Sequence, residues 1–207
     1  MRWFYRIAYS LIWPFVMIFN PPRTSGRENV PEGAALFCIN HQSIMDPLIL
    51  CVSLGVKHWL HFMAKDEAMR APVLGKLLRM CGTFGVKRGR SDIKSIKTAL
   101  AYLKSGEKVA IFPQGTRIPN DLCSEYKTGA AMLSIRAHVP VVPVYMENCH
   151  GRPFRRIRVI IGKAFSLVGR EGQPRTEQYR SGAEEIFQNI KALADMAGAG
   201  TEAGAGA

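Results

Sequence analysis

Along most of the chain, short continuous apolar runs alternate with longer stretches in which apolar residues recur every three or four positions. Continuous runs of about four to eight apolar residues are typical of buried strands, whereas the longer recurrence is typical of helices that bury one face. Regular alternation of the two predicts an α/β domain with a mixed, mostly parallel sheet flanked by helices on both faces. Strands are expected at 34–39, 58–64, 82–86, 108–112, 139–146 and 157–161.

The segments between these runs carry the usual signals of helix starts and ends. The range 91–105 is the most distinct, with Ser91 placed to cap it and Gly106 placed to end it. Asp46 stands at the expected cap of an earlier helix, and Pro47 occupies its favoured first turn. Helices are expected at 48–54, 71–80, 91–105, 130–137 and 177–196.

The N-terminal segment 1–22 begins with an almost wholly apolar stretch. Its range 7–19 is shorter than the ~20 apolar residues that a membrane-spanning helix needs, and it contains Pro14. Trp3 and Trp13 are amphipathic aromatic residues of the kind that gather at the lipid headgroup boundary. We therefore expect 1–22 to be an amphipathic, membrane-associated helical segment that lies in or dips into one leaflet.

Two other interpretations of this segment exist. A secretory signal peptide would end in a small-x-small cleavage site, but the segment runs into Asn20, Pro21, Pro22 and Arg23. An ordinary N-terminal core helix stays open, because a stretch of about 10–14 apolar residues often forms only that.

At 207 residues, the chain is long enough for one domain with a full core and a single site. We expect the α/β domain at 23–196, between the helical segment and a tail at 197–207. The tail consists mostly of Gly and Ala, has nothing to bury, and is expected to be disordered.

The chain is strongly basic, with 28 Lys and Arg against 16 Asp and Glu and a formal net charge of +12. Such a charge favours phosphate-bearing ligands, anionic membrane surfaces or nucleic acid, and it does not choose among them. The cysteines are far apart and form neither a Cys-x-x-Cys pair nor a cluster with histidine at metal-ligand spacing. We expect reduced, buried thiols and no metal site. The cysteines are Cys38, Cys51, Cys81, Cys123 and Cys149.

His41 and Asp46 lie on the loop between an expected strand and the helix that follows it. A turn there can fold the Asp46 carboxylate onto one ring nitrogen of His41, which leaves the other nitrogen to take a proton from an alcohol. No serine nucleophile is required if a substrate hydroxyl attacks a thioester directly. Taken alone, the spacing favours a plain helix cap beside a loop histidine, because it arises easily by chance.

The segment 112–117 follows another expected strand. Gly115 permits close approach of the backbone, Thr116 offers a hydroxyl, and Arg117 offers a fork that suits phosphate. This segment and His41 should both lie at strand ends, where open α/β sheets gather their ligands. A glycine turn with a surface arginine is the plain alternative.

The segment 82–90 delivers up to three further cations, among them Arg88, to a place lined by glycine. A phosphate pocket fits this composition, and a solvated basic hairpin fits it nearly as well.

The order of these blocks resembles the glycerolipid acyltransferases typified by 1-acylglycerol-3-phosphate acyltransferase. The four blocks of that family match, in order, 40–46 (NHx₄D), 82–88 (ending in arginine), 112–117 (FPEGTR) and 139–144 (proline-bearing). Lys65 falls where the family often has a lysine between the first two blocks. The resemblance runs from about Asn29 to Ile161, and four blocks in order are a specific signal.

The resemblance implies a role for each matching residue. His41 would deprotonate the acceptor hydroxyl, and Asp46 would orient the imidazole. The cations implied to hold the acceptor's phosphate are Lys65, Arg88 and Arg117, and the residues implied to shape the substrate site are Gln114, Gly115 and Thr116. The range 139–144 is equally a buried strand bent by its prolines, so we assign it a structural role.

The implied reaction moves a fatty acyl group from acyl-CoA or acyl-carrier protein to the sn-2 hydroxyl of 1-acylglycerol-3-phosphate, giving phosphatidic acid in phospholipid biosynthesis. Because the donor is a co-substrate, no metal or other cofactor is implied. The expected partners are membrane lipid, the lysophospholipid acceptor and the acyl donor. The expected location is the cytoplasmic face of the cell membrane.

The sequence departs from the family pattern in two places. Gln114 stands where the third block normally has glutamate, which removes a negative charge but keeps hydrogen-bonding capacity. Gly85 and Lys87 replace the aromatic and acidic residues common in the second block. Neither change touches the His-Asp pair, so loss of catalysis is not implied.

Features of the sequence raise three alternatives to this reaction. Nucleic-acid binding needs a basic stripe with aromatic platforms or a recognition helix, but 91–105 has an ordinary mixed polar face, so no nucleic-acid partner is expected. A non-catalytic lipid-binding relative, motivated by Gln114, stays open. An acyltransferase that uses another lyso-lipid acceptor also stays open.

Overall fold

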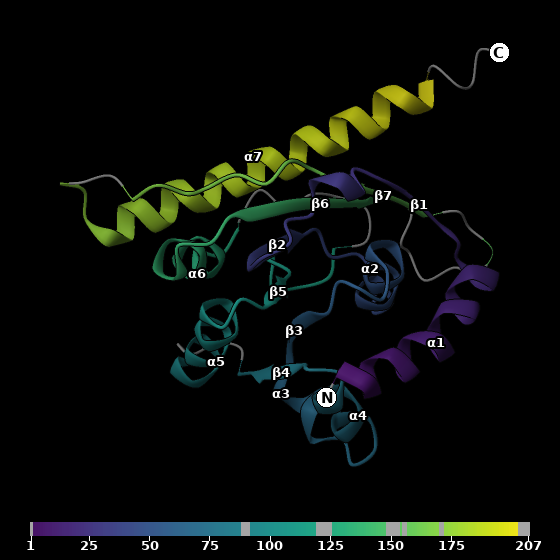
Figure 1. Cartoon of the computed structure of the whole chain (residues 1–207). Coiled ribbons are helices and arrows are strands. Elements are labelled where there is room, and N and C mark those ends of the chain that lie inside the picture. The colour runs from purple at the N-terminus through teal and green to yellow at the C-terminus, as the bar shows by residue number, and fades with distance from the viewer. Residues whose placement is uncertain are drawn as a thin grey trace.

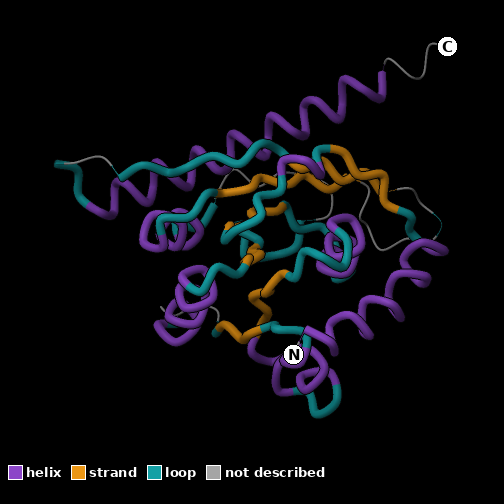
Figure 2. The backbone as a smooth tube through the Cα atoms, viewed as in Figure 1, coloured by secondary structure: helices purple, strands orange, loops and turns teal. Residues whose placement is uncertain are grey.

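The fold is shown by a computed structural model, which describes residues 2–87, 92–118, 126–147, 154, 157–169 and 172–202 (Figure 1). Helices enclose a central sheet, and Figure 2 shows the strands in orange between them. The architecture is the mixed, mostly parallel α/β arrangement that the sequence predicts.

The described strands form one seven-stranded sheet in the order β1-β7-β6-β2-β5-β3-β4. The neighbouring strands are parallel except for β6 and β7, which are antiparallel. The strands are β1 (Pro22–Ser25), β2 (Ala35–Ile39), β3 (Leu60–Lys65), β4 (Phe84–Val86), β5 (Lys108–Ile111), β6 (Val141–Glu147) and β7 (Ile157–Ile161).

The helices cover both faces of this sheet (Figure 1). Helices α1 and α2 lie on one face, and α5, α6 and α7 lie on the other. The helices are α1 (Arg2–Phe19), α2 (Asp46–Leu54), α3 (Asp66–Arg70), α4 (Leu74–Met80), α5 (Ile93–Lys104), α6 (Gly129–Ala137) and α7 (Arg175–Glu202), with a 3₁₀ turn at Arg27–Asn29.

The strand β2 shows why the apolar runs are continuous. All five of its residues are buried, and successive side chains point to opposite faces. Phe37 packs in the core cluster beneath α1 and α2, whereas Leu36 and Cys38 pack in the cluster beneath α5, α6 and α7. A strand covered on both faces has no polar side, so alternation of polar and apolar residues is absent.

Several boundaries differ from those that the sequence predicts. Asp92, rather than Ser91, caps α5, and Ser91 lies outside the described residues. Met45 is the N-cap of α2, so Asp46 is its first helical residue and its carboxylate is free for another role. Helix α7 continues to Glu202 instead of ending at Met196, and residues 203–207 lie outside the described part.

Two elements carry no sequence signal strong enough to find them. The strand β1 has the sequence Pro-Arg-Thr-Ser and alternates half-buried and exposed residues at the edge of the sheet. It is a strand because its backbone pairs with β7, from Pro22↔Ile157 to Ser25↔Ile160. The short helix α3 follows β3 directly, in a range where the sequence predicts no element.

Helix α1 has two apolar faces. Tyr5, Ala8 and Val16 are buried against the domain, whereas a second set of large apolar side chains is exposed to solvent. No helix within the described residues is long and apolar enough to cross a membrane. The exposed set consists of Trp3, Ile7, Leu11, Trp13, Phe15, Met17 and Ile18.

The cap of α5 gives a testable dependence of stability on pH. The Asp92 carboxylate accepts hydrogen bonds from the hydroxyl of Ser95 at 2.6 Å and from the backbone N–H groups of Lys87 at 2.9 Å and Ser95 at 3.2 Å. These bonds, led by that of the Ser95 side chain, lower the pKa of Asp92 from 3.8 to about 2. Because the folded-state pKa is depressed, the stabilisation is present above about pH 4 and is lost as the pH falls toward about 2.

We predict that Asp92→Ala lowers the thermal unfolding midpoint at neutral pH, and that its difference from the parent shrinks as the pH falls through this window. Circular dichroism melts at a series of pH values measure this difference. Asp195→Ala, which removes an exposed carboxylate from α7, is the matched control. A difference that stays constant down to the acid limit would contradict the assignment.

Candidate active site

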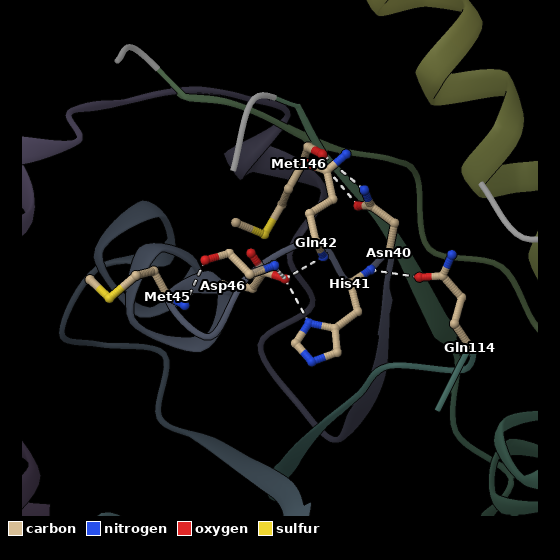
Figure 3. Close-up of polar contacts among 8 residues, drawn as sticks. Asn40, His41, Gln42, Met45, Asp46, Gln114 and Met146 are labelled. Atoms are coloured by element: carbon tan, nitrogen blue, oxygen red, sulfur yellow. Dashed lines mark hydrogen bonds and ion pairs between the residues drawn. The ribbon is translucent and has the colours of Figure 1, made fainter. Parts of the chain in front are cut away.

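The turn after β2 brings His41 and Asp46 into contact, as the spacing allows (Figure 3). Nδ1 of His41 lies 2.7 Å from Oδ2 of Asp46. Asp46 is fully buried, and 12% of the His41 side chain is exposed. The ring is therefore held from the protein side while one edge stays open to a substrate.

The Asp46 carboxylate is fixed by the backbone as well as by His41. Its Oδ2 also accepts hydrogen bonds from the backbone N–H groups of Gln42 at 2.8 Å and Ser43 at 3.0 Å. A carboxylate can only accept, so Nδ1 of the neutral His41 ring carries the hydrogen in this bond. Nε2 is then the ring nitrogen with a free lone pair, which is the form required of a general base.

The segment 112–117 also contacts His41. The His41 ring stacks on Phe112, with ring centroids 4.1 Å apart and planes tilted by 23°. The backbone N–H of His41 donates to Oε1 of Gln114 at 2.7 Å, and the N–H of Ile118 donates to the carbonyl of His41 at 2.8 Å. Two blocks that lie 73 positions apart in sequence thus form one site.

Strand pairing explains why the blocks meet. The parallel strands β2 and β5 pair from Ala35↔Lys108 to Cys38↔Ile111, so both end at the same edge of the sheet. His41 follows the end of β2, and Gln114 follows the end of β5. This edge is where open α/β sheets place their ligand sites.

Asn40 is a positioning residue whose role the sequence did not reveal. Its side-chain amide donates to the carbonyl of Met146 at 2.8 Å, and its Oδ1 accepts from the backbone N–H of Met146 at 2.7 Å (Figure 3). These two bonds tie the end of β2 to β6 immediately before His41. The only sequence signal was the position of Asn40 beside the histidine.

Gln114 accepts a hydrogen bond from His41 that a glutamate at this position could also accept. The side chain is buried, and its Oε1 accepts from His41. A glutamate at this position would present the same oxygen, so the change preserves the acceptor that holds the His41 backbone. The amide nitrogen Nε2 is buried without a hydrogen-bond partner among the described residues.

The other residues expected in the site are less tightly placed. Gly115 has a left-handed backbone, with φ of 70°, which suits glycine. Thr116 and Arg117 are exposed beside it. Nζ of Lys65, at the end of β3, lies 3.2 Å from the exposed Glu67 carboxylate, so Lys65 must leave this ion pair to reach a phosphate. Arg88 lies outside the described residues.

No group of three or more His, Cys, Asp or Glu side chains that could hold a metal ion occurs within the part of the chain that the structure describes. The contacts that define the site are the His41–Asp46 pair and the stack of His41 on Phe112.

Comparison with known proteins gives the family. The family model described as Acyltransferase matches residues 22–147, which include His41, Asp46 and the whole segment 112–117. The chain belongs to the acyltransferase family. Two of the blocks on which the resemblance rests, 40–46 and 112–117, contact each other at one edge of the sheet.

This acyltransferase is similar to several curated proteins. It is 31% identical over 173 residues to the 1-acyl-sn-glycerol-3-phosphate acyltransferase of Bacillus subtilis (strain 168), a match that covers 81% of this chain and 85% of the relative. It is 30% identical over 154 residues to the enzyme of the same name from Pseudomonas aeruginosa, covering 70% of this chain and 59% of the relative.

The acyltransferase also shares its fold with a solved structure. The crystal structure of the 1-acyl-sn-glycerophosphate (LPA) acyltransferase PlsC from Thermotoga maritima superposes with a TM-score of 0.66 and 21% sequence identity. The match covers 93% of this chain and 77% of that protein. At this identity the likeness shows the fold alone.

The geometry around Gln114 gives a testable prediction. Gln114→Glu should keep acyl transfer within a few-fold of the parent, because its oxygen accepts from His41 as before. Gln114→Met, which has a similar length and only a weak sulfur acceptor, should lower kcat by up to about 100-fold, since a displacement of the base by about 1 Å can cost that much. Steady-state kinetics with labelled donor measure both. Equal activity of the Met variant and the parent would show that this hydrogen bond does not position His41.

Proposed function

We propose that this acyltransferase moves a fatty acyl group from acyl-CoA or acyl-carrier protein to the sn-2 hydroxyl of 1-acylglycerol-3-phosphate, giving phosphatidic acid. The observation that carries the proposal is the His41–Asp46 pair at 2.7 Å, set beside a segment that bears Arg117. A base with a neighbouring cation suits an acceptor that has both a hydroxyl and a phosphate. The names of the relatives from B. subtilis and P. aeruginosa agree with this acceptor.

The base would act through Nε2 of His41. As the acceptor hydroxyl attacks the thioester carbonyl, Nε2 takes its proton and the Asp46 carboxylate stabilises the imidazolium. The tetrahedral intermediate then collapses with cleavage of the carbon–sulfur bond, and the imidazolium returns the proton to the leaving thiolate. The products are the ester and the free thiol, so atoms and charge balance with the thioester as the only co-substrate.

The acceptor's phosphate would be held by cations around this edge of the sheet. Arg117 is exposed two residues after Gly115, and Lys65 lies at the end of β3 on the same edge. The ion pair of Lys65 with Glu67 is exposed and therefore weak, so exchange of the carboxylate for a phosphate costs little. Arg88 is proposed as a third cation from its sequence position. Gln114, Gly115 and Thr116 would shape the wall beside the acceptor.

The exposed face of α1 supports attachment to a membrane. Trp3, Ile7, Leu11, Phe15 and Ile18 are each at least half exposed and follow one another at intervals of three or four positions. Such spacing places them on one face of the helix, opposite the residues that pack against the domain. We propose that this face lies in the cytoplasmic leaflet of the cell membrane, where lipid acceptors reside, and that the net charge of +12 adds attraction to anionic lipid.

The base assignment is tested by His41→Ala. We predict that kcat falls by about 10²–10⁴-fold, the usual contribution of a general base. Purified protein in detergent micelles is assayed with labelled acyl-CoA and labelled acyl-carrier protein against 1-acylglycerol-3-phosphate. His138→Asn is the matched control, because His138 is an exposed histidine that precedes β6 at the opposite edge of the sheet. Parental turnover by His41→Ala would exclude His41 as the base, and a parent that acylates only other acceptors would refute the proposed substrate.

The membrane face is tested by a pair of substitutions in α1. Leu11→Gln with Ile18→Gln should weaken binding to vesicles of phosphatidylcholine and phosphatidylglycerol by about tenfold or more, because each side chain gives up roughly 1–2 kcal/mol of apolar burial in the bilayer. Vesicle flotation measures the bound fraction. Val168→Gln with Met196→Gln is the control, since both side chains are equally exposed but lie with α7 and the segment before it. The same loss in both pairs would contradict a specific role for α1.

A further inference from the structure

Lys127 reaches the active site although it lies outside all four sequence blocks. A Cβ atom added to Gly115 would come within 2.8 Å of Nζ, 2.9 Å of Cε and 3.2 Å of Cδ of Lys127. The end of the lysine side chain therefore occupies the space that a side chain at position 115 would need. Absence of a side chain at Gly115 is what admits the ammonium group to this place.

Two contacts hold the backbone at Lys127 in place. Its N–H donates to the carbonyl of Pro113 at 3.1 Å, inside the segment that wraps around His41. The preceding residue, Tyr126, packs against Phe187 of α7 with ring centroids 5.0 Å apart. The position of this lysine is thus set by the fold, and only its side chain is free to adjust.

The ammonium group lies beside the turn that follows Gln114. Gly115, which it covers, directly follows Gln114, whose oxygen holds the backbone of His41. Arg117 is exposed two residues further on, so two cations flank the same glycine turn. Lys65, in contrast, is already engaged with Glu67.

We propose that Lys127 binds the phosphate of the lysophospholipid acceptor and makes the enzyme select acceptors that carry a phosphate. This inference rests on the proposed function. A phosphate monoester carries a charge of about −1.5 to −2 near neutral pH, which exceeds what one cation can neutralise. The ammonium of Lys127 supplies a point charge with three donors, and the guanidinium of Arg117 supplies a planar fork, so the two complement each other.

The test separates phosphate recognition from catalysis and folding. Lys127→Met keeps an unbranched chain over Gly115 without charge, and Lys127→Arg keeps the charge. Lys163→Met is the matched control, since Lys163 is an exposed lysine that follows β7 near the start of β6, at the edge opposite His41. Each protein is assayed with 1-acylglycerol-3-phosphate and with 1-acylglycerol of the same chain length, and its melting temperature is recorded.

We expect Lys127→Met to raise KM for the phosphorylated acceptor by about tenfold, as for loss of one charge-assisted hydrogen bond, with kcat within a few-fold of the parent. Its kcat/KM for 1-acylglycerol should not change. Lys127→Arg should restore most of the affinity, and Lys163→Met should behave as the parent does. A purely structural role would instead lower the melting temperature and affect both acceptors equally, which would overturn the proposal.

Binding measured without turnover keeps the two proposals distinguishable. The fluorescence of the protein's tryptophans is titrated with 1-acylglycerol-3-phosphate in detergent micelles, with 1-acylglycerol as the uncharged comparison. If the parent transfers no acyl group but binds the phosphorylated lipid more tightly than Lys127→Met does, the proposed function fails and the role of Lys127 stands. If Lys127→Met equals the parent in binding and in KM, Lys127 does not recognise the phosphate.

Discussion

The parallel pairing of β2 with both β5 and β6 is the constraint on which the site depends. Within β2, Cys38 lies opposite Ile111 of β5 and Pro143 of β6. Because the strands run in the same direction, the residues that follow them converge at one edge. A slip of one residue would exchange the side chains of β2 between the two core clusters and put Phe37 where Leu36 and Cys38 pack, so close packing on both faces holds the register and with it the site.

Buried polar side chains convert this convergence into a defined geometry. Asn40 joins β2 to β6, Gln114 joins the β5 segment to the His41 backbone, and Asp46 holds the imidazole ring. In a low-dielectric interior such bonds are strong, and breaking one would leave a buried polar group unpaired at a cost in free energy. Each bond therefore holds its own segment in place. His41, which lies on a loop, thereby has the fixed orientation that a general base requires.

Helix α1, which has the exposed apolar face, shares a core cluster with the helix that carries Asp46. Val16 of α1 packs in the same cluster as Ile49 and Leu50 of α2. At its two ends, α1 meets Trp59 through Tyr5 and Phe154 through Phe19, with ring centroids 5.9 Å and 5.5 Å apart. The proposed membrane face is thus connected through packed side chains to the helix that begins at Asp46, which fits an acceptor that arrives from the bilayer.

The sequence by itself determined the α/β class, most strands, the order of the family's blocks and the His-Asp spacing, because apolar periodicity and motif spacing are local properties. The tertiary structure decided what depends on residues far apart in the chain. The polar segment β1 is a strand only because β7 offers a pairing edge. Asp46 faces His41 instead of capping α2, Gln114 holds the backbone of His41, and Lys127 covers Gly115. No local pattern encodes such contacts, since each arises only when the sheet places separate strand ends side by side.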